Sequence, residues 1–156
     1  MTRLAVFIST FAHVGDVPFA PGTAGSAAGL VVFYLIGQGR LAEAIAIVVL
    51  FALGIWSGTL AEQHFGMSDP GPVVIDEVMG MLITLWGIPV GWTGALAGFV
   101  IFRAMDVVKP FPANRLEHLH GGLGVMADDA MAAVYGNLLL RAAVWLLPVL
   151  RVAPHA

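Results

Sequence analysis

Five of the ten acidic residues of this 156-residue chain lie in three short clusters at the ends of long apolar segments. The clusters are Asp76 with Glu77, then Asp106, then Asp128 with Asp129. An uncompensated carboxylate beside hydrocarbon is costly, so acids grouped in this way need a shared partner. The sequence therefore predicts that these carboxylates bind a cation. For one Asp taken alone, capping of a helix start is the simpler interpretation.

The side chains available in this chain favour a hard cation. It has no cysteine, which excludes a disulfide framework, a cysteine nucleophile and a thiolate metal site. Its histidines form no pair at helical spacing, and His118 and His120 lie two apart in a polar stretch. Ligands that are all oxygen favour magnesium over zinc. Adjacent acids such as Asp76 and Glu77 point about 100° apart on a helix, so one can face other helices while its neighbour faces a loop.

Composition places these acids in a membrane protein. Hydrophobic residues make up 59% of the chain and charged residues 11%, and the mean hydropathy is +0.90, whereas roughly 25% of residues in soluble proteins are charged. We predict an all-α fold: a polytopic membrane bundle of about five long helices plus a short N-terminal helix, in one integral-membrane domain over residues 1–156. The net charge of -3 and the scattered basic residues give no signature of nucleic-acid binding.

The expected long helices cover residues 23–36, 41–61, 73–87, 92–108 and 128–147. Residues 1–15 begin like a signal peptide but lack a cleavage site, which favours a retained, peripheral or partly inserted helix. If all five long helices cross the membrane, the acid clusters fall on one face. The face with the acids holds Arg3, Arg103, Lys109 and Arg115, and the opposite face holds Arg40 and Arg151. Because Lys and Arg are more frequent on the cytoplasmic side of membrane proteins, this difference favours a cytoplasmic location for the face with the acids.

Two glycine-bearing segments add a second kind of chemistry. PFAPGTAGS, residues 18–26, leads into a predicted helix start whose free amides, with the hydroxyls of Thr23 and Ser26, can hold a phosphate. GGLGVMADD, residues 121–129, repeats the arrangement before the last helix. The cations Arg103 and Lys109 fit the same role, with interfacial snorkelling as the alternative. Gly and Pro before a membrane helix are also ordinary loop residues.

Four segments, PFAPGTAGS, VVIDEVMG, FRAMDVVKPFP and GGLGVMADD, in this order and at these separations, resemble the phosphatidylglycerophosphatase A family of bacterial magnesium-dependent lipid phosphatases. The resemblance spans residues 19–135. It implies hydrolysis of phosphatidylglycerol phosphate to phosphatidylglycerol and inorganic phosphate, in the inner membrane, during phospholipid synthesis. It also implies a compact bundle with one central helix surrounded by others. The chain departs from the family at HVGDVPF, where a glycine-rich approach is usual, which leaves the role of Asp16 open.

The residues and the resemblance together give a candidate site for Mg²⁺ and a lipid phosphate. A phosphate monoester would be repelled by bare carboxylates, so a metal must reverse the local charge. The predicted metal ligands are Asp76, Glu77, Asp106 and Asp129. The predicted catalytic residues are Asp76, Glu77, Asp106, Lys109, Asp128 and Asp129. The predicted phosphate-binding residues are Pro21, Gly22, Thr23, Ser26, Arg103 and Lys109. Attack by water and an aspartyl-phosphate intermediate both stay open, as do metal number, selectivity among lipid phosphates and oligomeric state.

Two alternatives from other functional classes are a cation-coupled transporter and a non-enzymatic scaffold. Acids within a membrane are typical of transporters, but a transporter favours acids at the midplane and broken helices in related halves. The scaffold alternative draws on glycines four residues apart, a spacing that allows close helix packing. These pairs are Gly25 with Gly29, Gly54 with Gly58, and Gly94 with Gly98.

Overall fold

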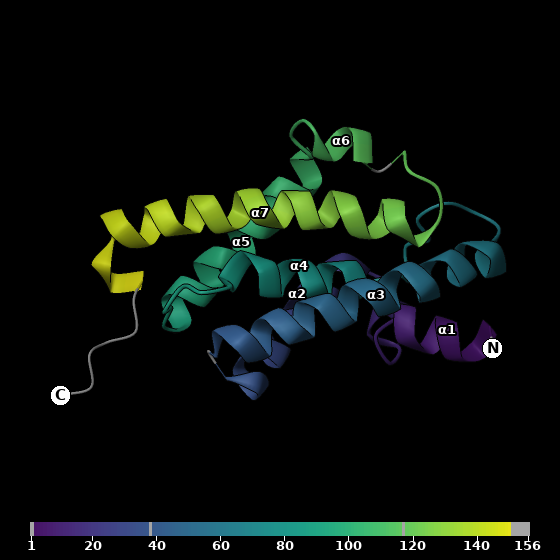
Figure 1. The fold of residues 1–156 in the computed structure, drawn as a ribbon, viewed down its shortest axis with the longest axis horizontal. Helices are drawn as coiled ribbons and strands as arrows, with labels where there is room; N and C mark the ends of the chain where they lie inside the picture. The colour runs from purple at the N-terminus through teal and green to yellow at the C-terminus, as the bar shows by residue number, and fades with distance from the viewer. Residues whose placement is uncertain (1, 38, 117, 151–156) are drawn as a thin grey trace.

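The chain folds into helices throughout the part that the computed structural model describes, which is residues 2–37, 39–116 and 118–150. Within these ranges no β-strand occurs, which confirms the all-α prediction. Figure 1 shows α3 and α7 running lengthwise with α4 between them. The α-helices are α1 (Thr2–Ser9), α2 (Pro21–Ile36), α3 (Arg40–Phe65), α4 (Ile75–Leu85), α5 (Trp92–Val108), α6 (Ala113–Leu116) and α7 (Gly122–Leu146), with 3₁₀ turns at Val14–Asp16 and Pro148–Leu150.

Helix α4 lies at the centre of this arrangement. It packs against α2, α3, α5 and α7. Nine of its eleven residues are buried, from Ile75 at its start to Leu85 at its end. A helix that is apolar on nearly all sides is stable only when other helices surround it. The two acids of its first turn, Asp76 and Glu77, are therefore carried into the interior.

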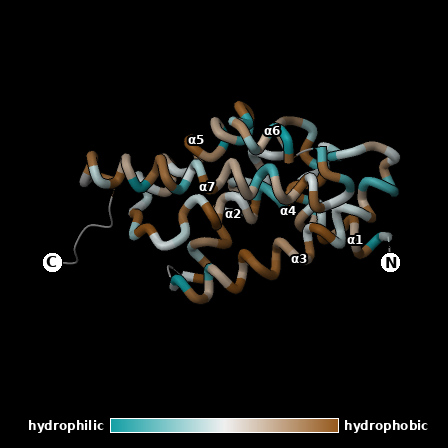
Figure 2. The backbone as a smooth tube through the Cα atoms, turned by 45° about the horizontal axis from the view of Figure 1, so that its top comes forward, coloured by the Kyte–Doolittle hydropathy of each residue, from teal (hydrophilic) through white to brown (hydrophobic). Residues whose placement is uncertain are grey.

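Two helices are long and apolar enough to cross a membrane: α3 with 26 residues and α7 with 25. Only 22% of the apolar window of α3 is buried, and Figure 2 shows apolar residues along this helix. An exposed apolar face of this length is expected to contact lipid. The predicted third helix over residues 73–87 is present as α4, but it is shorter than predicted. Helix α4 has 11 residues, a length of about 16 Å, which is too short for a hydrocarbon core of about 30 Å.

The start of α7 also differs from the prediction. The helix begins at Gly122, so Asp128 and Asp129 lie in its second turn rather than at its first residues. The Gly122 N–H donates to Thr59 Oγ1 of α3 at 2.9 Å. A Cβ on Gly122 would clash with the Ile55 carbonyl and lie 2.8 Å from Gly54 O. The glycines thus let α7 start directly against the backbone of α3, which caps it.

The N-terminal segment fixes the entrance to α4. Residues 11–13 have positive φ angles of 47°, 55° and 69°, so the right-handed helix does not continue beyond α1. The turn places Gly15 so close to Pro72 O that a Cβ would clash. The Val74 N–H donates to Ser9 O at 2.9 Å. Helix α1 therefore holds the residues that lead into Asp76 and Glu77.

Candidate active site

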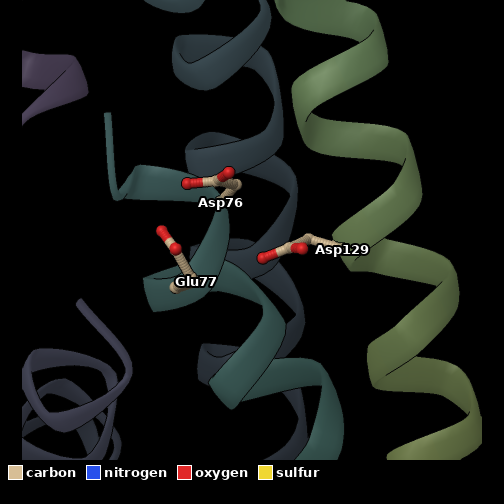
Figure 3. Close-up of side chains that lie close together, drawn as sticks. All are labelled: Asp76, Glu77 and Asp129. Carbon is tan, nitrogen blue, oxygen red and sulfur yellow. The ribbon is translucent and has the colours of Figure 1, made fainter. Parts of the chain in front are cut away.

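Three helices bring the five clustered acids together. Asp76 and Glu77 come from the first turn of α4, Asp106 from the end of α5, and Asp128 and Asp129 from α7. Asp76, Glu77 and Asp129 each offer one oxygen, and these oxygens lie within 4.8 Å of one another. Figure 3 shows the Asp129 side chain of α7 facing the two acids of α4. We call Asp76, Glu77 and Asp129 the acidic trio.

The acidic trio fits a small hard cation. Oxygens bound at about 2.1 Å to an octahedral ion such as Mg²⁺ lie about 3.0 Å apart when adjacent and about 4.2 Å apart when opposite. The separations in the trio reach this range with small inward movements. Among the described residues, buried oxygens Asp76 Oδ1, Glu77 Oε2 and Asp129 Oδ2 have no hydrogen-bond partner. Buried carboxylate oxygens without partners are costly, and a cation removes that cost.

The local charge balance supports the same conclusion. Two cations face five carboxylates. Arg103 Nη1 lies 2.7 Å from Asp106 Oδ2 and 3.7 Å from Glu77 Oε1, and Lys109 Nζ lies 2.5 Å from Asp128 Oδ2. Within the described residues, neither Asp76 nor Asp129 has an ion pair with a basic side chain. The excess of negative charge is thus concentrated on the trio.

Burial changes the protonation of the two acids in α4, which is not one of the candidate spans. It raises the pKa of Asp76 well above its ordinary value, and the nearby charges of Glu77 and Asp129 raise it further. Burial also raises the pKa of Glu77 to about 7, although hydrogen bonding with Asp76 and the charge of Arg103 oppose this rise. A raised carboxyl pKa means that the metal-free fold loses stability as pH rises from the ordinary value of 4.5 towards 7. Metal binding must displace these protons.

Asp106 and Asp128 are paired with cations and lie beside the trio. The sequence analysis placed Asp106 among the metal ligands, whereas the structure pairs it with Arg103 and leaves it outside the group whose oxygens converge within 4.8 Å. Asp106 still lies close enough to Asp129 for its charge to act on that carboxylate. Asp128 is 4% exposed and one of its oxygens has no hydrogen-bond partner in the described part of the chain.

The start of α2 lies directly against this cluster. A Cβ on Gly22 would clash with Glu77 Oε1 and lie 3.0 Å from both terminal nitrogens of Arg103. Three residues on, a Cβ on Gly25 would lie 2.8 Å from Val74 Cβ and 3.3 Å from Glu77 Cβ. Because both positions lack a side chain, the backbone of α2 reaches the pair formed by Glu77 and Arg103.

The hydroxyls predicted to bind phosphate differ in their positions. Pro21 is the first residue of α2, and Thr23 is exposed. The Thr23 N–H is already used, since it donates to Ala20 O at 2.9 Å. Ser26 is fully buried and its hydroxyl donates to Gly22 O at 2.9 Å. The Ser26 proton is therefore not available to a ligand, which leaves the Gly22 amide and the Thr23 hydroxyl at this helix start.

The second glycine segment is not a free phosphate cradle. The Gly122 N–H is taken by Thr59, and the Gly124 N–H donates to Gly121 O at 2.9 Å. The Gly122 amide lies at the packed contact between α3 and α7, and the Gly124 amide is used within the first turn of α7. These two amides are therefore already used within the fold.

Two acids, Asp69 and Asp16, escaped the sequence analysis or were left without a role in it. The charge of Asp69, in the loop before α4, acts on both Asp76 and Asp128. Its N–H donates to Glu62 Oε1 at 3.2 Å. The turn-forming sequence SDPGP around Asp69 was the available signal. Asp16 pairs with His13 at 2.7 Å, and both side chains are more than half exposed.

A family model described as Phosphatidylglycerophosphatase A matches residues 7–144. A protein of Bacteroides thetaiotaomicron named "Putative phosphatidylinositol-3-phosphatase" is 38% identical over 92% of this chain and 96% of its own length. Proteins named phosphatidylglycerophosphatase A are 37% identical in Escherichia coli, over 77% of this chain and 72% of the relative, and 38% identical in Haemophilus influenzae, over 78% and 77%. No solved structure matches the chain.

Proposed function

We propose that this chain, which belongs to the phosphatidylglycerophosphatase A family, hydrolyses phosphatidylglycerol phosphate to phosphatidylglycerol and inorganic phosphate. The observation that carries the proposal is the acidic trio, buried at the start of the central helix and flanked by Arg103 and Lys109. A cation site next to two basic side chains suits a phosphate monoester, which carries up to two negative charges.

We infer that Asp76, Glu77 and Asp129 hold Mg²⁺. When bound, this ion would neutralise the trio and polarise the phosphate oxygens. Asp106 then acts through Arg103, because the 2.7 Å ion pair fixes the guanidinium beside Glu77. Arg103 and Lys109 bind the phosphate oxygens and stabilise charge on the transferred group. The Gly22 amide and the Thr23 hydroxyl at the start of α2 add donors at the positive end of the helix dipole.

The same geometry favours Asp128 as the general base. Glu77 belongs to the trio, whereas Asp128 lies outside it and has a buried oxygen without a hydrogen-bond partner among the described residues. Lys109, 2.5 Å from the other oxygen, holds the carboxylate in place. Asp128 Oδ1 can accept the proton of an attacking water as the water oxygen bonds to phosphorus. The phosphorus–oxygen bond to the glycerol of the lipid breaks in the same displacement, and the leaving oxygen takes up a proton from water to give phosphatidylglycerol.

An apolar groove beside the site supports a lipid substrate. It has a volume of about 240 Å³ between α1 and α3, and Ile75, the neighbour of Asp76, forms part of its wall with Phe7 and Leu53. An acyl chain lying in this groove would place a headgroup near the trio. The two candidate spans, α3 and α7, support a membrane location for the protein. We further propose a multi-pass inner-membrane location with the site on the cytoplasmic face. The family match lends no support to the transporter alternative.

The test is phosphate release by the purified protein in mixed micelles with Mg²⁺. Three substrates are compared: phosphatidylglycerol phosphate, phosphatidylinositol 3-phosphate and water-soluble glycerol 3-phosphate. We expect phosphatidylglycerol phosphate to have the highest kcat/KM, and glycerol 3-phosphate the lowest because it cannot use the apolar groove. A higher kcat/KM for phosphatidylinositol 3-phosphate would assign the site to the substrate named for the Bacteroides relative. No release from any of the three would refute the enzyme assignment.

The contact between α2 and the site gives a prediction at Gly22. In Gly22→Ala the added methyl group must displace the Glu77 carboxylate or the Arg103 guanidinium. Overpacking of this kind costs about 1–3 kcal/mol, so we expect kcat/KM to fall by about 10-fold or more. Gly71→Ala is the matched control, because nothing lies within 4 Å of its Cβ position. Both variants are compared with the parent by kcat/KM and Tm. A Gly22→Ala enzyme with unchanged kcat/KM would show that α2 does not shape the site.

A further inference from the structure

Two arginines converge at the other end of α4, away from the acidic trio. Arg40 is the first residue of α3, and Arg141 lies near the end of α7. A Cβ on Gly87, just beyond α4, would lie 3.3 Å from Arg141 Nη2 and 3.7 Å from Arg40 Nε. In Figure 1 the start of α3 and the end of α7 both lie towards the left. Two like charges are therefore held around one glycine.

One buried acid offsets only part of this charge. Glu43 is 2% exposed. It accepts a hydrogen bond from the Gly87 N–H at 3.3 Å and interacts electrostatically with Arg40. Arg141 is fixed by donating to Asn137 Oδ1 at 2.8 Å and to Trp86 O at 3.0 Å. The Arg141 guanidinium is thus positioned by the fold, and the side chains of Arg40 and Arg141 are both exposed.

Two cavities open beside these arginines. One, of about 130 Å³, is lined by Arg40, Glu43, Gly87, Ile88 and Pro89. The other, of about 150 Å³, is lined by Arg40, Trp86, Gly87 and Arg141. Each is many times the ~10–15 Å³ that one water needs, so a group with several oxygens fits. Arg40 and Gly87 border both cavities.

The tryptophans at this end place it at the level of lipid headgroups. Trp86, Trp92 and Trp145 are 43%, 68% and 74% exposed. Trp86 follows α4, Trp92 begins α5, and Trp145 lies at the end of α7. Exposed tryptophans gather at membrane interfaces, where an amphipathic ring meets the headgroups. Phosphates at this level can reach the guanidinium groups.

We propose that Arg40 and Arg141 form a binding site for a phosphate-bearing anion, supplied by the headgroup of an anionic phospholipid. The planar guanidinium fork matches phosphate oxygens, and basic pockets between membrane helices suit such headgroups. We call the two cavities beside Arg40 and Arg141 the two-arginine pocket. The length of α4 separates the two-arginine pocket from Asp76 by about 16 Å, so the pocket is distinct from the site of hydrolysis.

The experiment uses the full chain in detergent micelles with a chelator present, and measures retained ligand by native mass spectrometry. The probes are dioleoylphosphatidylglycerol, dioleoylphosphatidylcholine and inorganic phosphate. We expect the parent protein to retain phosphatidylglycerol in preference to phosphatidylcholine. In Arg40→Gln/Arg141→Gln this affinity should fall about tenfold, since each basic residue near a membrane surface attracts anionic lipid. Arg3→Gln, which removes an exposed arginine of α1, is the matched control and should bind as the parent does.

Two further measurements distinguish lipid phosphate from free phosphate as the ligand, and show whether a loss of binding is due to misfolding. Arginine-dependent binding of inorganic phosphate, without retention of lipid, would support the pocket with free phosphate as its ligand. Because Arg141 also caps α4, Arg40→Gln alone is measured as well and should weaken lipid binding about threefold. Phosphatase activity should be unchanged in Arg40→Gln. Equal phosphatidylglycerol affinity in the double variant and the parent, or an equal loss in Arg3→Gln, would overturn the proposal.

Discussion

Removing divalent cations with a chelator is expected to lower phosphate release from phosphatidylglycerol phosphate by about 100-fold or more. Without a cation, the acidic trio offers no positive charge to the phosphate, and the nearby Arg103 and Lys109 are paired with Asp106 and Asp128. Loss of a single preorganised electrostatic group already costs about 100-fold or more in many active sites. The measurement is initial rate before chelation, after chelation, and after adding Mg²⁺ back.

The melting temperature, measured as Mg²⁺ is added back, gives a second test that does not depend on turnover. A cation that binds only the folded protein raises its Tm as its concentration increases. Added Mg²⁺ should therefore raise the Tm of the chelator-treated protein and restore its rate over the same concentration range. Full activity in protein shown to be free of metal would contradict the metal role of the trio.

Asp129→Asn is expected to lower the rate by about 100-fold or more and to stabilise the metal-free protein. Asp129 is 4% exposed, and one of its oxygens has no hydrogen-bond partner in the described part of the chain. Its neighbours Asp106, Glu77 and Asp128 are also acids. The amide keeps the shape of the side chain and removes both the ligand charge and the repulsion. A gain of about 1–2 kcal/mol would raise Tm by about 2–8 °C.

The opposite signs of these two effects separate a functional acid from a structural one. If Asp129 only supported the fold, its replacement would lower Tm and the rate together. In Asp129→Asn the increase of Tm by Mg²⁺ should also disappear. Asp16→Asn is the control, because Asp16 is an exposed acid paired with His13; its rate and its response to Mg²⁺ should match the parent. A near-normal rate in Asp129→Asn would remove Asp129 from the trio.

The sequence by itself determined the helical class, the family and the convergence of the acid clusters. Long apolar segments separated by Gly, Pro and charged residues leave few structures other than membrane helices. The alternating direction of consecutive helices predicts that Asp76, Asp106 and Asp128 lie towards one end of the bundle. The motifs around these residues are local and specific, so the resemblance to the family could be stated without a structure.

Only the tertiary structure decided which acids form the trio. Helical spacing predicts that neighbouring acids point about 100° apart, but the neighbour that each one meets depends on how the helices pack. The structure pairs Asp106 with Arg103 and turns Glu77 towards Asp76 and Asp129. Ser26, predicted to face a ligand, faces the interior because α2 packs its glycines against α4.

The ends of helices and the two-arginine pocket also depend on contacts between distant segments, which local sequence does not predict. Helix α7 begins at Gly122 because Thr59 of another helix caps it, and no local pattern contains that partner. Arg40 and Arg141 are about a hundred residues apart in the chain. They lie close together because α3 and α7 pack around Gly87. Local sequence fixes what each segment is, through propensity and hydrophobicity. Which side chains share a site depends on contacts between segments, and the free energy of those contacts exists only in the packed fold.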